Sequence, residues 1–449
     1  MKKIFQYIML AVVTIVMASC TSDIEETTAT TGKSNVQLVV GEFPAFGDSQ
    51  TRTIGTPDPG KTSWAVGDEL LLVIDNTSYG SHSATFTYNG KSWELTSGEL
   101  VYREGDPAYI PHVYYAPNYK WANTSLMLKK GKAAGTDEYI EGTARITGNG
   151  ETITVSFAEA TRNYSRLRIA TLPNEQITVD TEYFTPAGSS DMEQNGNYTL
   201  TSDEKGNAYL YGTFENNSEV TVKYREAALT TYTFSQATES AKSYALDATV
   251  ISANSAEEIK SAIEQKVADG KTTIRLNLAP NAGTNEFMAI REAIKGAAPN
   301  DLGTIELTII GVETIPEEAF YKMLQLKSVR MSDVKEIKKY AFKECQYLTV
   351  VEAPSLNKLC SGAFKKCDQL AKLTFGPINY ADERNWPIFE YITPNIDLIL
   401  SDYQKEMIET DSYLYTANND RDYAGSDEHN SKNFLGREFR SITCRYPVE

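Results

Sequence analysis

Catalytic side chains are scarce in this sequence. Its 449 residues include three histidines and five cysteines, which leaves little material for a metal site or for histidine-dependent catalysis. The motifs Gly-x-Ser-x-Gly and His-Glu-x-x-His and a Cys-x-x-Cys pair are absent. We therefore expect a protein that is not an enzyme and that binds neither a cofactor nor a metal.

Basic residues are also fewer than acidic ones. The chain has 43 lysines plus arginines against 60 aspartates plus glutamates, which gives a net charge of −17. A protein of this charge repels polyphosphate, which argues against a nucleic-acid partner. Tryptophan is rare, with 4 residues, whereas the 27 tyrosines favour β-strands. At roughly 150 residues per domain, the length suggests about three domains.

The N-terminus has the pattern of an export signal. Two lysines precede an apolar run from Ile8 to Met17, which is too short to cross a membrane as a helix. Small residues then lead to Cys20, and this ending resembles a bacterial lipobox, whose cysteine is acylated. We predict a signal peptide at residues 1–19, lipid attachment at Cys20 and a flexible polar tether at 20–35. The alternative is an ordinary secretory signal followed by an incidental cysteine.

The tether contains the acidic residues Asp23, Glu25 and Glu26. Acidic residues just after a lipidated cysteine resemble the surface-export signal of Bacteroidetes lipoproteins. This resemblance implies a protein that is lipid-anchored in the outer membrane and exposed on the cell surface. Without such a signal the protein would face the periplasm.

Residues 36 to 248 alternate between apolar and polar side chains, which predicts strands rather than helices. Asn89-Gly90 stands between two such segments and is a strong hairpin signal, because both turn residues need positive φ angles. Short strands at this spacing are typical of β-sandwiches. The length fits two of them, at residues 36–158 and 159–248.

Five segments of this region occur in the order seen in fimbrillin-like proteins of Bacteroidetes. The resemblance implies two tandem transthyretin-like β-sandwiches, which build type V pili or act as their anchors and tips. It also implies a candidate processing site at Arg52, where cleavage would remove the first strand and let a neighbour's strand replace it. Trp64 and Tyr114 are expected to pack in the core. The five segments are Thr51–Thr53, Trp64–Leu70, the hairpin around Trp93, Tyr114–Pro117 and Ser165–Ile169.

After Val250 the sequence takes on a helical period. Ser255 and Glu258 form a capping box, and apolar residues recur every four positions until Gly270 closes the helix. A strand and a second helix ending at Gly296 follow. We predict that residues 249–304 form an α/β cap.

A 22-residue repeat is the clearest signal in the chain. Ala-Phe pairs begin at residues 319, 341 and 363, and four further apolar columns keep the same spacing. The period predicts a short solenoid of leucine-rich repeats over residues 305–377, because each unit buries its apolar side only by stacking. Residues 378–449 are expected to form a C-terminal cap with an exposed acidic loop at 416–433. The fold class is therefore mainly β with a C-terminal α/β solenoid.

The repeats resemble the leucine-rich repeats of BspA-like bacterial surface antigens, whose pattern is Ile-x-x-x-Ala-Phe-x-x-Cys-x-x-Leu. Cys345 and Cys367 occupy the cysteine column, and Met323 fills it in the first unit. Such a column is expected to be a packing position rather than a metal site. A disulfide between Cys360 and Cys444 is left open, since it requires the C-terminal cap to fold back.

Alternate residues of the predicted strands point outward and form the candidate partner-binding face. This face contains no aromatic side chain. Two basic pairs, Lys338-Lys339 and Lys365-Lys366, lie outside the strands and are either solvated surface or contacts for an anionic glycan or an acidic partner. The outward residues are Ser328, Arg330, Val350, Glu352, Lys372 and Thr374.

Together these features predict a cell-surface lipoprotein, an adhesin in which a fimbrillin-like stalk presents a leucine-rich-repeat head to a protein or glycan on host or neighbouring cells. One alternative is a tip or anchor component of a type V pilus, which would bind pilus subunits by strand exchange. Another is a glycan-binding lipoprotein of a polysaccharide uptake system, which would need exposed aromatic platforms.

Overall fold

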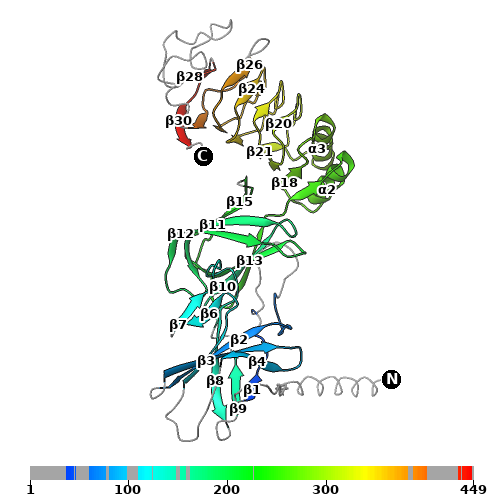
Figure 1. Ribbon diagram of the computed structural model, residues 1–449. Coiled ribbons are helices and arrows are strands. Elements are labelled where there is room, and N and C mark those ends of the chain that lie inside the picture. Colours follow the sequence, from blue (N-terminus) through cyan, green and yellow to red (C-terminus); the bar gives the residue numbers. More distant parts are fainter. Residues whose placement is uncertain are drawn as a thin grey trace, which may run out of the picture. The chain divides into compact units, whose positions relative to one another are not determined.

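The computed structural model describes residues 37–44, 46, 60–76, 80–98, 110–123, 125–147, 152–157, 162–225, 227–382, 388–401, 433–435 and 437–446 (Figure 1). The predicted signal peptide and tether, Cys20, Arg52 and all but the last residue of the acidic loop lie outside these residues. Within them, no helix is long and apolar enough to cross a membrane. The chain divides into two compact units. The first comprises residues 1–175, 179–220 and 232–247, and the second comprises 176–178, 221–231 and 248–449.

The first unit begins with a seven-stranded sheet in the order β1-β9-β8-β5-β2-β3-β4. Neighbouring strands are antiparallel except β1 and β9, which are parallel at one edge. Alternate side chains form an apolar core that includes Leu72, Phe86 and Trp93. The bounds are β1 Gln37–Val40, β2 Glu69–Asn76, β3 Gly80–Tyr88, β4 Trp93–Gly98, β5 Ile110–Tyr115, β8 Ile140–Thr147 and β9 Thr152–Ser156; β6 Tyr119–Ala122 and β7 Ser125–Leu128 form a separate two-stranded sheet.

The predicted hairpin at Asn89-Gly90 is confirmed and connects β3 to β4. Tyr88 pairs with Trp93, so the loop has four residues instead of two. Gly90 has a φ of 98°. The Asn89 side chain, by contrast, stabilises the turn by accepting hydrogen bonds of 2.8 Å from the N–H groups of Lys91 and Ser92.

A second sheet follows in the order β15-β14-β11-β13-β10-β16, with β12 paired to β11. Here too one edge strand is parallel to its neighbour, because β16 runs parallel to β10. The prediction of a mainly β chain is confirmed, and each of these two sheets is a single hydrogen-bonded set of seven strands. The bounds are β10 Ser165–Ala170, β11 Gln176–Pro186, β12 Glu193–Thr201, β13 Asn207–Phe214, β14 Glu219–Tyr224, β15 Ala227–Thr233 and β16 Ser243–Asp247.

The α/β segment follows β16, and its elements are β17 Ile251–Ala253, α2 Ala256–Ala268, β18 Thr273–Leu278 and α3 Thr284–Ala297. Half of the capping box predicted at the start of α2 is formed, because the Ser255 hydroxyl accepts a hydrogen bond from Glu258 N at 3.3 Å. The Glu258 carboxylate accepts its hydrogen bond from Asn254 N at 2.9 Å, one residue before the N-cap, instead of from Ser255 N.

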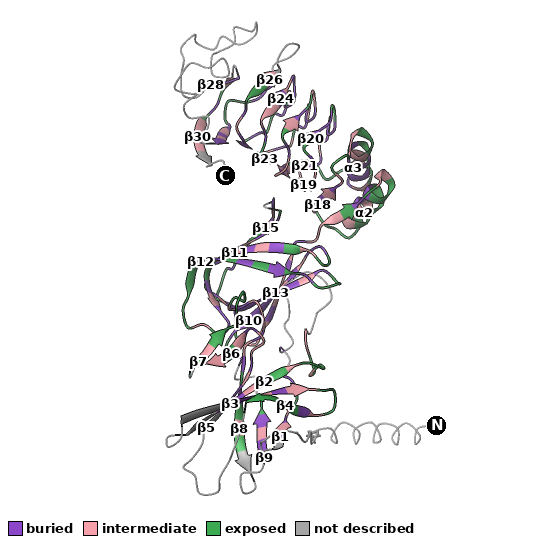
Figure 2. Ribbon diagram, viewed as in Figure 1, coloured by how far each residue is buried: buried purple, intermediate pink, exposed green. Residues whose placement is uncertain are grey.

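Two parallel sheets run through the second unit. One has the order β17-β18-β19-β21-β23-β25-β27-β30 and the other β20-β22-β24-β26. The 22-residue register holds between strands, since Val329 pairs with Val351 and Val351 with Leu373. Figure 2 shows buried and less buried residues alternating along these strands. The bounds are β19 Ile305–Ile310, β20 Thr314–Ile315, β21 Leu326–Met331, β22 Glu336–Ile337, β23 Val350–Ala353, β24 Lys358–Cys360, β25 Lys372–Phe375, β26 Tyr380–Asp382, β27 Asp397–Ser401, β28 Asn433–Phe434, β29 Arg437–Glu438 and β30 Ser441–Tyr446.

Phenylalanine rings form a stack through the core of the second unit. The ring centroids of Phe320, Phe342, Phe364 and Phe389 follow one another at 5.1, 5.4 and 5.7 Å, and the rings are nearly parallel. Because each ring covers the next, the stack needs a closing side chain at each end. Edge-to-face rings meet the two ends, and they belong to Phe287 of α3 and Phe439.

The stacked coils continue beyond residue 377, where the repeats were predicted to end. Leu373 of β25 pairs with Leu398 of β27, and Leu398 pairs with Ile442 of β30. The step from 373 to 398 is 25 residues, so the sequence period is broken while the structural repeat goes on. Residues 378–449, predicted as a closing cap, thus add strands to both parallel sheets.

The cysteines of the repeats lie in the core. Cys345 and Cys367 are buried, and each thiol donates to a backbone carbonyl 3.0 Å away. Burial raises the pKa of Cys345 to about 12. Cys360 and Cys444 are thiols that lie in different sheets, so the disulfide left open above is not formed. No group of three or more metal-ligating side chains is found among the described residues.

Candidate binding faces of the second unit

The structure brings the six predicted outward residues together on three neighbouring parallel strands, β21, β23 and β25. They form two rows across these strands, which we call the sheet face. One row is Ser328, Val350 and Lys372, and the other is Arg330, Glu352 and Thr374.

The charges of the sheet face are paired with one another. Arg330 Nε lies 2.9 Å from Glu352 Oε2, and Lys372 Nζ lies 3.9 Å from Glu352 Oε1. Beside this face, Arg440 directly before β30 binds the carboxylate of Asp397 in β27, and this hydrogen bond is the main reason why the pKa of Asp397 is well below its usual range. A charged ligand on this face would therefore compete with existing ion pairs.

Thr374 was predicted to be available to a partner, but this residue is only 4% exposed. Its short side chain lies between the longer side chains of Glu352 and Ile399, which occupy the adjacent positions of β23 and β27. The prediction of an exposed binding residue is wrong at this position, because a strand pattern gives the direction of a side chain but not the height of its neighbours.

A second face is formed by the turns that follow β20, β22 and β24, at residues 317–322, 339–344 and 361–366; we call it the turn face. Backbone N–H groups there donate to the next coil, as from Lys322 to the Lys343 carbonyl at 2.9 Å and from Glu344 to the Lys365 carbonyl at 2.8 Å. Lys322 and Glu344 have φ angles of 55° and 63°. This left-handed conformation is unfavourable for such residues, and the hydrogen bonds between coils stabilise it.

Lysine and tyrosine side chains meet on the turn face. The Lys343 ammonium lies 5.1 Å from the centre of the Tyr321 ring and 4.7 Å from that of Tyr340, on two successive coils. Lys339 lies 4.7 Å from the Tyr340 ring as well. These cation–π contacts orient the long lysine side chains along the face.

Two lysines of the turn face take part in no ion pair within the described part of the chain. Lys322 lies 3.5 Å from Glu344, and Lys365 is paired with Glu390. Neither Lys339 nor Lys366 has such a partner there. The three turns together hold five lysines and three glutamates, Glu317, Glu318 and Glu344, so the turn face carries a charge of +2, although the whole chain carries a net charge of −17.

The aromatic side chains of the turn face were not predicted as part of a site. Sequence analysis considered outward strand positions, which hold no ring, whereas Tyr321 and Tyr340 lie in turns of this face and Tyr391 lies in a later turn, next to Lys366. The sequence signal that could have indicated this face is the pairing of tyrosine with lysine at Tyr321-Lys322 and Lys339-Tyr340. These tyrosine and lysine side chains lie close together in space because of the left-handed turns, which the sequence pattern does not reveal.

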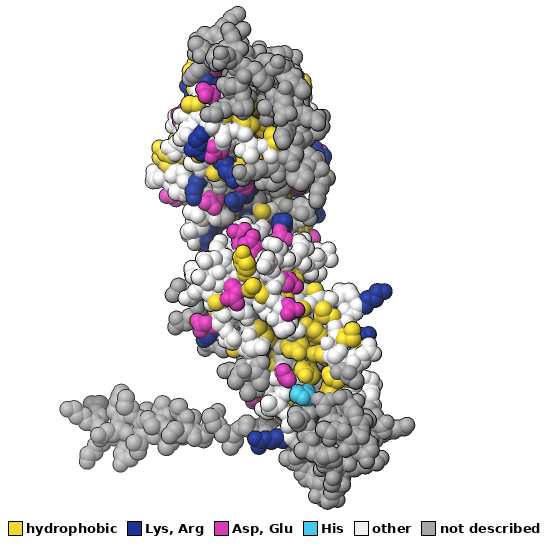
Figure 3. Space-filling model, turned by 90° about the vertical axis from the view of Figure 1, so that its left-hand side faces the viewer, with side chains coloured by type: hydrophobic (Ala, Val, Ile, Leu, Met, Phe, Trp, Pro, Cys, Tyr) yellow, Lys and Arg dark blue, Asp and Glu magenta, His cyan; other side chains and the backbone are white. Residues whose placement is uncertain are grey.

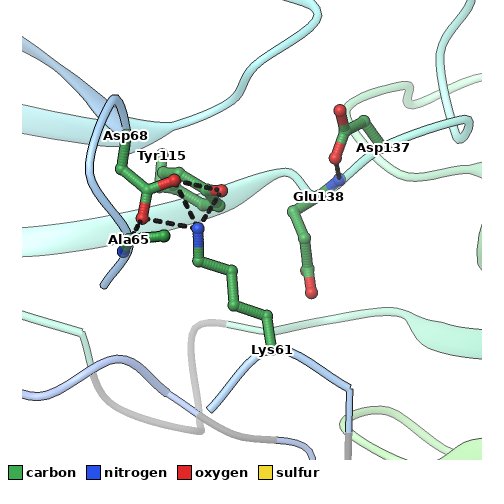
Figure 4. Close-up of polar contacts among 6 residues, drawn as sticks. All are labelled: Lys61, Ala65, Asp68, Tyr115, Asp137 and Glu138. Atoms are coloured by element: carbon green, nitrogen blue, oxygen red, sulfur yellow. Dashed lines mark hydrogen bonds and ion pairs between the residues drawn. The ribbon is translucent and has the colours of Figure 1, made fainter. Parts of the chain in front are cut away.

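A half-buried polar cluster lies in the first unit (Figure 4). Lys61 Nζ contacts both carboxylate oxygens of Asp68 and lies 2.9 Å from the Tyr115 hydroxyl oxygen. Burial and then the charge of Asp68 raise the pKa of Tyr115 well above its usual range. In Figure 4 the side chains of Asp137 and Glu138 stand apart from this contact. The cluster joins the turn before β2 to β5.

The residues before this turn carry a motif that sequence analysis overlooked. Residues 55–62 read Gly-Thr-Pro-Asp-Pro-Gly-Lys-Thr, which is the spacing of a phosphate-binding loop. In such a loop the lysine reaches a phosphate held at the start of a helix. Here Lys61 binds Asp68, and the chain continues into strand β2. Residues 55–59 lie outside the described residues, and the described context does not fit phosphate binding.

Trp64 lies beside this cluster in the aromatic core. Its ring centroid is 5.0 Å from that of Trp93 and 5.4 Å from that of Tyr115, both edge to face. The indole N–H donates to the carbonyl of Gly41 at 2.9 Å. The partly buried ring thereby packs against the core of the first sheet, as expected for a packing residue.

One comparison with known proteins bears on the repeats. Residues 301–404 match the family described as BspA type leucine rich repeat region, in six copies. No curated protein matches the chain. A similar solved structure is that of GBS52, the minor pilin of the Gram-positive pathogen Streptococcus agalactiae, with 10% identity, 47% of this chain and 93% of that chain covered, and a TM-score of 0.17. So low a TM-score supports no conclusion about this chain.

Proposed function

We propose that this protein is a cell-surface adhesin whose second unit binds an anionic partner through the turn face. In this proposal the protein is a lipoprotein anchored in the outer membrane through Cys20. Two transthyretin-like sandwiches of the fimbrillin type form its stalk, and the BspA-type repeats form a solenoid head. The protein performs no chemistry and acts by binding alone.

The difference in charge pairing between the two faces carries the proposal. On the sheet face, Arg330 and Lys372 both pair with the carboxylate of Glu352. On the turn face, Lys339 and Lys366 have rings rather than carboxylates beside them, at 4.7 and 5.9 Å. An incoming anion gains charge-assisted contacts at the turn face without breaking an ion pair.

The chemistry of the turn face favours a glycan that bears carboxylate or sulfate groups, or else an acidic protein segment. Tyrosine rings next to the lysines add apolar contact area. Neutral sugars would need open ring faces, whereas lysine ammoniums already lie over the rings of Tyr321 and Tyr340. The charge pattern therefore supports adhesion to an anionic partner over the uptake of a neutral polysaccharide.

Reversing the two uncompensated charges tests this function. In the full chain, Lys339→Glu combined with Lys366→Glu should weaken binding to sulfated and uronate-bearing glycans on an array by about tenfold or more, since each reversal replaces an attraction with a repulsion. Lys260→Glu with Lys271→Glu makes the same change in net charge at exposed positions outside the face and should bind like wild type. Binding of neutral glycans alone by wild type would instead favour the uptake protein. Equal losses in both double variants would mean that only net charge matters.

The edge position of β1 supports a second function in a pilus. Among the described strands β1 pairs with β9 alone, over four residues and in parallel. An edge strand held by one neighbour is suited to exchange with a strand of another chain. By its resemblance to fimbrillins, cleavage after Arg52 would release β1. The second unit follows the sheets that would polymerise, so a tip or anchor suits the chain better than a repeating shaft subunit.

The mass of the protein isolated from its own cells separates the two functions. An anchored adhesin is expected to begin at Cys20 and to carry acyl chains. A processed pilus component is expected to begin at Thr53 without lipid, because cleavage after Arg52 removes both the anchor and β1. A Cys20→Ser variant provides the control, since it should lose the acyl mass while keeping its sequence otherwise intact.

A further inference from the structure

The segment before Glu138 has an unusual charge composition. Residues 107–136 contain four lysines, at 120, 129, 130 and 132, and no aspartate or glutamate. Elsewhere the chain has an acidic excess large enough to give a net charge of −17. The same segment is rich in large apolar and aromatic residues, so it combines positive charge with apolar surface.

The centre of this segment is the hairpin of β6 and β7, which forms its own two-stranded sheet. Tyr119 pairs with Leu128 and Trp121 with Leu126, which places these four side chains on one side of the hairpin. Leu128 is 41% exposed, and Met127 on the other side is 44% exposed. Figure 3 shows a broad hydrophobic area on the first unit with basic side chains at its rim.

The hairpin is held in place at its base. The buried Asn118 side chain donates to the Ala133 carbonyl at 3.1 Å and to the Thr136 hydroxyl at 2.9 Å. At the first residue of β6, the Tyr119 ring packs on Tyr139 with centroids 5.2 Å apart. The exposed apolar residues therefore belong to a fixed element, and their exposure does not come from a loose loop.

We propose that the β6–β7 hairpin docks end-on on an anionic lipid surface, so that side chains from both of its sides, Trp121 and Leu128 on one and Met127 on the other, enter the interface while Lys120, Lys130 and Lys132 contact the headgroups. Exposed apolar patches of this kind mark interaction sites. Tryptophan and tyrosine are favoured at the membrane–water interface, and clustered lysines attract anionic headgroups. Protein interfaces, in contrast, are depleted of lysine.

This proposal does not depend on the function of the turn face. It would add a second contact with the lipid surface to the anchor proposed at Cys20, whose acyl chains attach only the N-terminus of the mature chain. The hairpin would supply that contact from the first unit. The two attachments are separable by experiment, since the hairpin should bind lipid in a chain that carries no acyl group.

Vesicle co-sedimentation of the mature chain with Cys20→Ser tests the docking. The protein should bind vesicles of phosphatidylcholine with phosphatidylglycerol, bind pure phosphatidylcholine far less, and be released by salt. Lys120→Glu with Lys130→Glu should lower the affinity about thirtyfold or more, since each lysine contributes about a factor of five near an anionic surface. Trp121→Ala with Met127→Ala should weaken binding even at low salt.

Lys260→Glu with Lys271→Glu is the matched control and should bind vesicles like wild type, because both residues are exposed in the second unit. Unchanged circular dichroism in each variant shows that the fold is kept. Failure of the Cys20→Ser chain to bind anionic vesicles would overturn the proposal, as would equal binding by the hairpin variants made in that chain. Self-association that is lost in Trp121→Ala with Met127→Ala, without any lipid binding, would identify a protein partner instead.

Discussion

Phe342→Ala should lower the free energy of unfolding of the second unit by about 3–5 kcal/mol. The ring is fully buried between Phe320 and Phe364, with centroids 5.1 and 5.4 Å away. Backbone hydrogen bonds between successive turns fix the distance between coils, so the neighbouring rings cannot close the gap. Since each coil contacts only its neighbours, the cavity also weakens the connection between the two halves of the stack.

Hydrogen exchange followed by mass spectrometry on the full chain measures this effect locally. Peptides from residues 305–377 should lose protection in Phe342→Ala, whereas peptides from the first unit should exchange as in wild type. Tyr380→Ala removes a ring of similar size that is 43% exposed and should change the stability by less than about 0.5 kcal/mol. Wild-type protection in Phe342→Ala would mean that the ring stack does not hold the coils together.

The repeat core was predictable because its signal is local and periodic. Positions 22 residues apart face the same neighbours, and the columns through Phe342, Leu348 and Val351 are all buried. The prediction failed where the step lengthened to 25 residues between Leu373 and Leu398. A fixed period cannot recognise a coil with three extra residues, although the strands on both sides of it pair in the same sheet.

The binding faces were only partly predictable. The 22-residue offset already places Arg330 opposite Glu352, so this ion pair on the sheet face could have been predicted from the sequence. The turn face was not, because its side chains meet through left-handed residues such as Lys322 and Tyr340. Nothing in the residue types requires that conformation. It follows from the hydrogen bonds to the next coil.

The buried charges of the first unit were also missed. Strand alternation places Leu167 inside and Arg166 outside, yet Arg166 is 1% exposed and so is Arg162. Both guanidinium groups lie over the ring of Phe46, at 3.7 Å for Arg162 and 4.7 Å for Arg166. Phe46 is more than a hundred residues away in the sequence, and a contact of that range leaves no periodic signal.

Glu138→Ala should destabilise the first unit by about 3–5 kcal/mol, because it leaves the buried Arg162 without its carboxylate. Glu138 Oε2 lies 3.0 Å from Arg162 Nη2, and the Tyr164 hydroxyl donates to the same carboxylate at 2.7 Å. Burial raises the pKa of Glu138, and the charge of Arg162 opposes this shift. The loss is measurable by denaturant unfolding followed by tryptophan fluorescence, since three of the four tryptophans, at 64, 93 and 121, belong to the first unit.

A compensating double variant distinguishes an uncompensated charge from a simple cavity. Glu138→Leu with Arg162→Met removes both charges and fills most of the space, so it should recover most of the stability that Glu138→Ala loses. Glu141→Ala removes a nearby carboxylate that is 49% exposed and should cost less than about 0.5 kcal/mol. If the double variant were as unstable as Glu138→Ala, the loss would come from packing around Phe46 and Tyr164 rather than from the buried charge of Arg162.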